Sequence, residues 1–229
     1  MTKTVDQPPA PQRARQIRGA IWVALALVVV ACIVGFLMIS GNGKNDEVPA
    51  SSTAQVIRDD SHRLTDPAVE KAQLVEFLDF ECEACRGAIP LVDDLKAEYG
   101  DRITFAHRYY PLPGHRNSGT SALAAEAAAQ QGKYEAMVDK LYATQPEWGE
   151  SSDSKAALFR TYAQELGLDM AAFDAAVGST QTLDRVNQDV ADGKALGVSG
   201  TPTFFLDGKK LTLNTEAQFR QLLDAAVAD

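Results

Sequence analysis

The chain has 229 residues, of which 45% are hydrophobic, enough to fill the core of one ordinary domain. Its 22 Lys and Arg residues against 31 Asp and Glu residues give a net charge of −9. This balance argues against a nucleic-acid-binding surface, which needs clustered basic residues. The three cysteines are too few for a scaffold held by disulfides.

The first forty residues predict a membrane anchor. Residues 21–39 carry no charge, and a helix of about 19 residues at ~1.5 Å per residue roughly spans a hydrocarbon core. Lys3, Arg13, Arg15 and Arg18 precede this run, whereas Lys44 stands with Asp46 and Glu47 just after it, which favours a cytoplasmic location for residues 1–20. We therefore expect a single-pass protein of the cell membrane, with its N-terminus cytoplasmic and the rest of the chain extracytoplasmic.

Two other interpretations of the apolar run remain open. A cleaved signal peptide would need a shorter apolar core and a cleavage motif of small residues. A lipoprotein would carry its lipid on Cys32, although the apolar run continues beyond this residue to Ile39. Otherwise Cys32 is a small apolar residue buried in lipid.

The remainder of the chain divides into a linker and a domain. Residues 40–60 begin with a stretch rich in Ser, Gly, Asn and Pro, which cannot bury enough apolar surface to order itself, and we expect a flexible linker there. Residues 61–229 are then the folded domain. There is no internal repeat that would indicate a solenoid.

The domain begins with a predicted strand, helix and second strand. The segment AQLVEFLDF, residues 72–80, is a nearly continuous apolar run of strand length, as in a strand covered on both faces. A helix should follow Cys85 and end before Gly100, a residue type favoured just after a helix. The alternating segment RITFAHRYY, residues 102–110, predicts the second strand, which prolines then end.

A helical block and a hairpin should complete the domain. Between about 116 and 195 no segment reads as a strand, and apolar side chains recur at helical spacing in three stripes: Tyr134, Met137 and Leu141; Leu158, Tyr162 and Leu166; Leu183, Val186 and Val190. The segments TFFL and KKLTL flank an Asp-Gly turn and read as a β-hairpin, and residues 219–227 close the chain as a helix. The fold class is therefore α/β.

Cys82 and Cys85 lie at the predicted junction of strand and helix. At a helix N-terminus the free N–H groups and the positive end of the dipole favour a thiolate on the first cysteine. One helical turn brings the second cysteine close enough to form a disulfide. Cys82 can therefore attack, Cys85 can resolve, and a Cys82–Cys85 disulfide is expected.

Further residues complete a known pattern around the two cysteines: Glu76, Pro90, Thr201 and Pro202. Together with the cysteines they resemble the thioredoxin superfamily. With the helical block and the segment RYYPLPGHRNS, the chain is most similar to the DsbA-like branch of extracytoplasmic thiol:disulfide oxidoreductases. The resemblance covers roughly residues 64–227 and implies a thioredoxin-like fold with a helical insertion at about 116–195.

The resemblance also implies roles for these residues. Pro202 would be a cis-proline that faces the disulfide, and Thr201 would offer its backbone to a bound substrate strand. Glu76 would be a buried acid beneath Cys85, with a pKa raised by desolvation, which takes and returns the proton of the resolving thiol. The alternatives are a Glu76 side chain that reaches solvent at the strand end and a Pro202 in an ordinary turn.

The residues between the cysteines depart from the resemblance. Strongly oxidising members carry a His there, whereas this chain has Glu83 and Ala84, preceded by Asp79 and Glu81. An anion about 6 Å from Cys82 opposes its thiolate by roughly 1–3 kcal/mol. We therefore expect Glu83 and Ala84 to tune the pair towards milder oxidation.

The sequence thus predicts an enzyme that exchanges disulfides with secreted or envelope proteins, above all to form them, without a cofactor or metal. A membrane redox partner would recycle the cysteines. Extracytoplasmic reduction or isomerisation is the alternative reaction. Two other classes remain: a metal-binding module, although His62, His107 and His115 show no ligand spacing, and a redox-inactive domain that binds partners.

Overall fold

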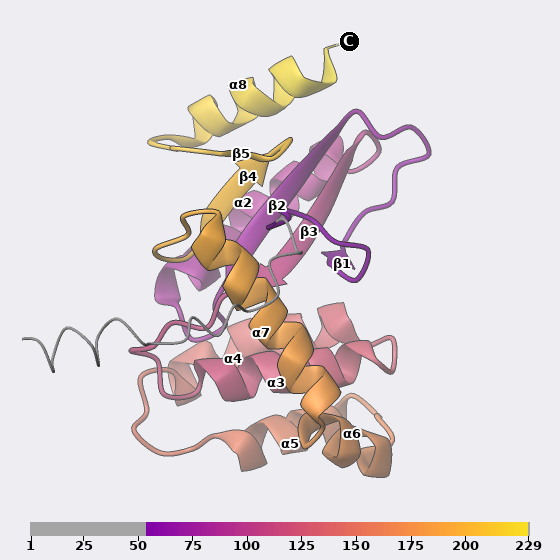
Figure 1. The fold of residues 1–229 in the computed structure, drawn as a ribbon, viewed down its shortest axis with the longest axis vertical. Coiled ribbons are helices and arrows are strands. Elements are labelled where there is room, and N and C mark those ends of the chain that lie inside the picture. The colour runs from indigo at the N-terminus through magenta and orange to yellow at the C-terminus, as the bar shows by residue number, and fades with distance from the viewer. Residues whose placement is uncertain (1–53, 229) are drawn as a thin grey trace, which may run out of the picture. The chain divides into compact units, whose positions relative to one another are not determined.

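The computed structural model describes residues 54–228, which form a five-stranded sheet and the helices around it (Figure 1). The strand order is β1-β3-β2-β4-β5. The central strand β2 (Ala72–Leu78) runs parallel to β3 (Ile103–Tyr109) and antiparallel to β4 (Thr203–Leu206). Two short strands, β1 (His62–Arg63) and β5 (Lys209–Lys210), form the edges. The mixed α/β class expected from the sequence is confirmed.

Helices cover one face of this sheet and explain the apolar run of β2. Helix α2 (Glu83–Tyr99) begins directly after Cys82 and ends before Gly100. Its buried residues pack with those of α8 (Glu216–Val227) against alternate side chains of β2 and β3, including Leu74. Because successive side chains of a strand point to opposite faces, Glu76 lies on this same face.

The opposite face is covered by helix α7 (Thr180–Ala195) and by the chain that precedes β1. Val56 and Ile57, which fall within the expected linker 40–60, pack there against buried residues of β2 and β3. The cytoplasmic tail 1–20, the anchor 21–39 with Cys32 and the linker as far as residue 53 lie outside the described residues. Within residues 54–228 no helix is long and apolar enough to cross a membrane.

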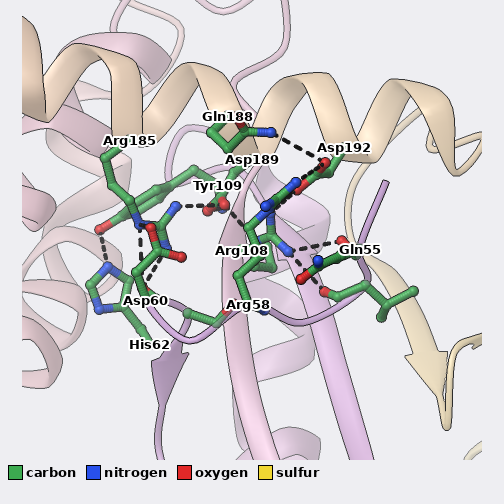
Figure 2. Close-up of polar contacts among 12 residues, drawn as sticks. Gln55, Arg58, Asp60, His62, Arg108, Tyr109, Arg185, Gln188, Asp189 and Asp192 are labelled. Atoms are coloured by element: carbon green, nitrogen blue, oxygen red, sulfur yellow. Dashed lines mark hydrogen bonds and ion pairs between the residues drawn. The ribbon is translucent and has the colours of Figure 1, made fainter. Parts of the chain in front are cut away.

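Buried ion pairs fasten this second face (Figure 2). The guanidinium of Arg108 on β3 is fully buried, with Nε 2.5 Å from Asp189 and Nη2 2.6 Å from Asp192. Arg185 also pairs with Asp189, and Arg58 pairs with Asp192. Arg108 Nη1 donates 3.0 Å hydrogen bonds to the backbone carbonyls of residues 55 and 56. The chain before β1 is thereby held to both β3 and α7.

The helical block between β3 and β4 contains five helices in the described chain: α3 (Ser118–Ala129), α4 (Tyr134–Trp148), α5 (Ala156–Glu165), α6 (Met170–Val177) and α7. The three predicted stripes correspond to α4, α5 and α7. Helix α3 is rich in alanine on every side, so no apolar stripe marks it. Helix α6 has only eight residues, too few to show a period, and Asp169 caps its N-terminus.

The predicted hairpin is present, although its second strand is shorter than the segment KKLTL suggested. Asp207 and Gly208 have φ angles of 47° and 77°, the left-handed geometry of a two-residue hairpin turn. Pairing continues from Lys209 to Lys210, and Leu211 adds one backbone bond to Phe204. The hairpin forms one edge of the sheet. The segment that precedes β4 contacts Cys82, which follows the C-terminal end of β2.

Candidate active site

The two cysteines occupy the N-terminus of α2 in different environments. Cys82 is the N-cap residue, with an extended backbone, and Cys85 lies one turn into the helix. Both are free thiols. The exposed fraction is 8% for Cys82 and 1% for Cys85. Cys82 is therefore the thiol within reach of another molecule, although it is less open to solvent than an exposed nucleophile.

The surroundings shift the pKa values of these thiols in opposite directions. A hydrogen bond from Cys85 is the main cause that lowers the pKa of Cys82 to about 5, helped by the backbone N–H groups of Ala84 and Cys85 against the opposing effect of burial. Burial, the contact with Cys82 and the charge of Glu76 raise the pKa of Cys85 well above its usual value. Near neutral pH, Cys82 is a thiolate and Cys85 a thiol.

The segment between α7 and β4 meets Cys82. The Thr201–Pro202 peptide bond is cis. The Sγ of Cys82 lies 3.3 Å from the carbonyl oxygen of Thr201, to which Cys82 donates a hydrogen bond when it is protonated. The Thr201 hydroxyl is buried without a hydrogen-bond partner. The structure thus brings together the two parts of the sequence motif, which are 119 residues apart.

Glu76 is buried on the central strand, with 7% of its surface exposed. Its side chain lines a cavity together with Cys85, so it does not escape to solvent at the strand end. Burial is the main cause that raises its pKa to about 8, and the negative charge of Cys82 adds to it. A protonated carboxyl therefore lies beside the cavity that the Cys85 thiol lines.

Glu83 and Ala84 lie in the first turn of α2 and are exposed. Water screens a charge at such a position. The hydrogen bonds from the Cys85 thiol and the N–H groups of the helix lower the pKa of Cys82. The repulsion between Glu83 and the Cys82 thiolate stays a prediction.

Asp79 and Glu81 have a structural role that sequence reasoning missed. Both are almost fully buried. Asp79 accepts hydrogen bonds from the backbone N–H of Glu81 at 2.8 Å and of Leu112 at 3.0 Å, and from His115 Nδ1 at 2.6 Å. These bonds tie the loop before Cys82 to the segment after β3, in which His115 lies.

The carboxylate of Glu81 accepts two backbone bonds, from Asn117 at 2.6 Å and Glu150 at 2.9 Å. Gln145 on α4 donates to the carbonyls of Phe80 at 2.8 Å and Cys82 at 3.0 Å. The helical block therefore fixes the backbone on which Cys82 is carried. A pattern within the sequence could not reveal Gln145, because its partners lie more than 60 residues away.

The three histidines do not form a set of metal ligands with the cysteines in the described part of the chain. His62 contacts Glu126 and Tyr109, whereas His107 faces Glu76. Within residues 54–228 no group of three or more His, Cys, Asp or Glu side chains could hold a metal ion. The site provides a Cys82 thiolate that accepts a hydrogen bond from the protonated Cys85 thiol. It also provides the buried acid Glu76, which lines the same cavity as Cys85.

Comparison with known proteins places the chain in a family. A family model described as "Thioredoxin" matches residues 69–225. The chain is 36% identical over 156 residues to a Na(+)/H(+) antiporter NhaA of Herminiimonas arsenicoxydans, an alignment that covers 66% of this chain and 23% of that protein. The chain therefore spans less than a quarter of the length of this curated relative.

Solved structures share the fold. The thioredoxin-like oxidoreductase from Silicibacter pomeroyi DSS-3 has a TM-score of 0.64 and 26% identity, covering 77% of this chain and 97% of that one. Wolbachia pipientis alpha-DsbA1 also has a TM-score of 0.64, with 18% identity, covering 75% of this chain and 93% of that one. The matched family model, which covers more than half of the chain, shows that the chain belongs to the thioredoxin family.

Proposed function

We propose that this protein is a thiol:disulfide oxidoreductase that acts on other proteins through Cys82 and Cys85. The observation that carries the proposal is the placement of Cys82 at the N-cap of α2, beside the Thr201 carbonyl, with the buried Cys85 one turn further on. Opposite shifts of the two thiol pKa values accompany this placement. A thiolate with a low pKa is a good leaving group, and a neighbouring thiol that holds its proton is a controlled resolving group. The likeness to a solved thioredoxin-like oxidoreductase at 26% identity supports the same reaction class.

In the oxidising direction, a substrate thiolate attacks Cys82 Sγ in the Cys82–Cys85 disulfide. The S–S bond breaks, and the Cys85 thiolate takes the proton of the Glu76 carboxyl. A second substrate thiolate then attacks the substrate sulfur of the mixed disulfide and releases Cys82 as a thiolate. Thr201 and Pro202 flank Cys82 on the side from which an extended substrate segment would approach.

Replacing Cys85 by Ala should trap the first intermediate. Cys82 can still attack a substrate disulfide, but no thiol is left to resolve the product, so mixed disulfides should accumulate in cells that express the full chain. Non-reducing electrophoresis followed by mass spectrometry would identify the trapped proteins. The matched variant Cys82→Ala should trap none, and trapping by Cys82→Ala instead of Cys85→Ala would reverse the assigned roles.

We further propose that the substrates are secreted or envelope proteins with cysteines, that residues 21–39 anchor the chain with its domain outside the cytoplasm, and that a membrane redox partner recycles the pair. The uncharged run of residues 21–39 supports the anchor. The likeness to part of proteins named Na(+)/H(+) antiporter is consistent with a place at a membrane. Cytoplasmic proteins as the main species trapped by Cys85→Ala would contradict it.

Glu83 would tune the potential of the pair. Its carboxylate repels the Cys82 thiolate, which exists in the reduced form alone, so Glu83→His should stabilise that form. For an exposed charge this amounts to about 0.5–1 kcal/mol, which raises the reduction potential by about 10–20 mV. Equilibration with glutathione at low salt would measure it, with Ala84→Ser as the neutral control. An unchanged potential in Glu83→His would show that Glu83 does not set the potential of the pair. The potential of the unmodified protein would indicate whether the pair oxidises or reduces its substrates.

A further inference from the structure

His107 is a buried imidazole that the proposed reaction does not yet use. It lies on β3, directly opposite Glu76 of β2 in the parallel register, so the two side chains share one face of the sheet. The distance from His107 Nε2 to Glu76 Oε2 is 3.7 Å. This is longer than a direct hydrogen bond and leaves room for a small approach or for a bridging water.

The other groups around His107 hold it in place and keep it uncharged. Its Nδ1 lies 3.2 Å from the hydroxyl of Tyr134 on α4, and the Tyr134 ring stacks on His62 with 3.8 Å between centroids. Burial is the main cause that lowers the pKa of His107 to about 3, and the positive charges of His62 and Lys96 add to it. The imidazole is therefore neutral at rest, and the pKa of Glu76, about 8, means that His107 can hold a proton from Glu76 only for a moment before passing it on.

A cavity of about 40 Å³ connects this pair with solvent. Glu76, His107 and Cys85 line it from the sheet and α2, and the acidic side chains of Asp93, Glu135 and Asp139 line it with Lys96. The side chains of Asp93 and Glu135 are more than half exposed. At ~10–15 Å³ per water, the cavity can hold at least two water molecules. Cys82 does not line it, so substrate and protons reach the site from different sides.

We propose that His107 is the group through which Glu76 exchanges its proton with water, an inference that rests on the disulfide exchange proposed above. When a partner's disulfide reoxidises the pair, the protonated Glu76 first transfers its proton to His107 Nε2, and the imidazolium releases a proton to water in the cavity. The Glu76 carboxylate then takes the proton of Cys85. The Cys85 thiolate attacks Cys82 Sγ in the mixed disulfide, the new S–S bond forms, and the partner's thiolate leaves.

His107→Gln provides a test that separates this role from a structural one. At a pH below the pKa of Glu76, about 8, the carboxyl is protonated at the start. It must lose this proton before it can take the proton of Cys85. Because water replaces the imidazole in part, we expect reoxidation of the reduced variant by a peptide disulfide to slow by about three- to tenfold at pH 6.5, and not at pH 9. Reduction of the disulfide form at pH 6.5, which uses the proton already on Glu76, should keep its rate.

His62→Gln is the matched control, because it removes a partly buried imidazole from the same aromatic cluster without contacting Glu76. Loss of the His62 charge would raise the pKa of His107, which favours proton transfer and so cannot mimic the slowing expected of His107→Gln. In His62→Gln, the ratio of the reoxidation rate at pH 6.5 to that at pH 9 should equal the ratio in the unmodified protein. Equal slowing of His107→Gln at both pH values, or the same profile in His62→Gln, would overturn the proposal. If neither protein exchanged disulfides at all, the proposed function would fail instead.

A measurement on the unmodified protein covers the case in which His107→Gln does not fold. In reduced protein with ¹⁵N-labelled histidine, the ring nitrogens of His107 should shift with the same midpoint as the ¹³C signal of the Glu76 carboxyl. A His107 signal that stays flat through that midpoint would show that the imidazole takes no part in the titration of Glu76.

Discussion

Replacing Arg108 by Met should lower the free energy of unfolding by about 3–5 kcal/mol, the range found when one partner of a buried ion pair is removed. The Arg108 side chain and that of Asp189 are fully buried, and Asp192 is nearly so. Without the guanidinium, Asp189 still pairs with Arg185, and Asp192 still pairs with Arg58. The two carboxylates lose the positive charge of Arg108 that lies between them and offsets their repulsion. The backbone carbonyls of residues 55 and 56 also lose their donor.

Urea denaturation would measure this change, read as a shift of the midpoint at constant slope. Arg160→Met is the matched control, because Arg160 also makes two hydrogen bonds to a carboxylate, both to Asp174 at 2.8 Å, but on the surface, with both side chains about half exposed. Water screens that pair, so its loss should have little effect. Similar losses in the two variants would show that burial does not determine the strength of the Arg108 pairs.

The parts of the site that the sequence predicted are those encoded by local spacing. Cys82, Cys85 and Glu76 lie within ten residues of one another, and the continuous apolar run around Glu76 marks a strand covered on both faces. The Thr201–Pro202 segment is distant in sequence, and its assignment came from the resemblance rather than from any period.

What the sequence did not reveal depends on contacts between distant segments. Asp79 and Glu81 look like two more anions beside Cys82, and their role follows only from partners that lie 33 to 69 residues away. The buried pair of Arg108 and Asp189 joins positions 81 residues apart. His107 reads as one member of an alternating strand, and only the register of β2 with β3 places it opposite Glu76.

Replacing Glu76 by Gln should make the reduced protein more stable at pH 8 and less active. The pKa of Glu76 is raised from 4.5 to about 8 in the folded protein. Its contribution to stability is therefore fully present below pH 4.5 and is lost as the pH rises through about 8. The loss approaches roughly 1.4 kcal/mol per pH unit between these values, because the unfolded state has already released the proton.

Cys82 acts in the opposite direction and hides this effect in the unmodified protein. Its pKa is lowered from 9.0 to about 5, so its contribution is present above pH 9 and is lost as the pH falls through about 5. Between pH 5 and 8 the two groups nearly cancel. Glu76→Gln keeps the Cys82 contribution alone, so the stability of the reduced variant should rise with pH across this window.

Relative to the unmodified protein, the variant should therefore gain roughly 3–4 kcal/mol on going from pH 5 to pH 8, measured by urea denaturation under reducing conditions. Exchange should fall by about 10²-fold, the lower end of the usual effect of a general acid–base group, because no carboxyl remains to serve the Cys85 thiol. Glu147→Gln, at an exposed position of α4, should change neither quantity. A stability difference that stays constant from pH 5 to pH 8 would show that Glu76 does not hold its proton in the folded state, and the buried acid would then be no proton donor for Cys85.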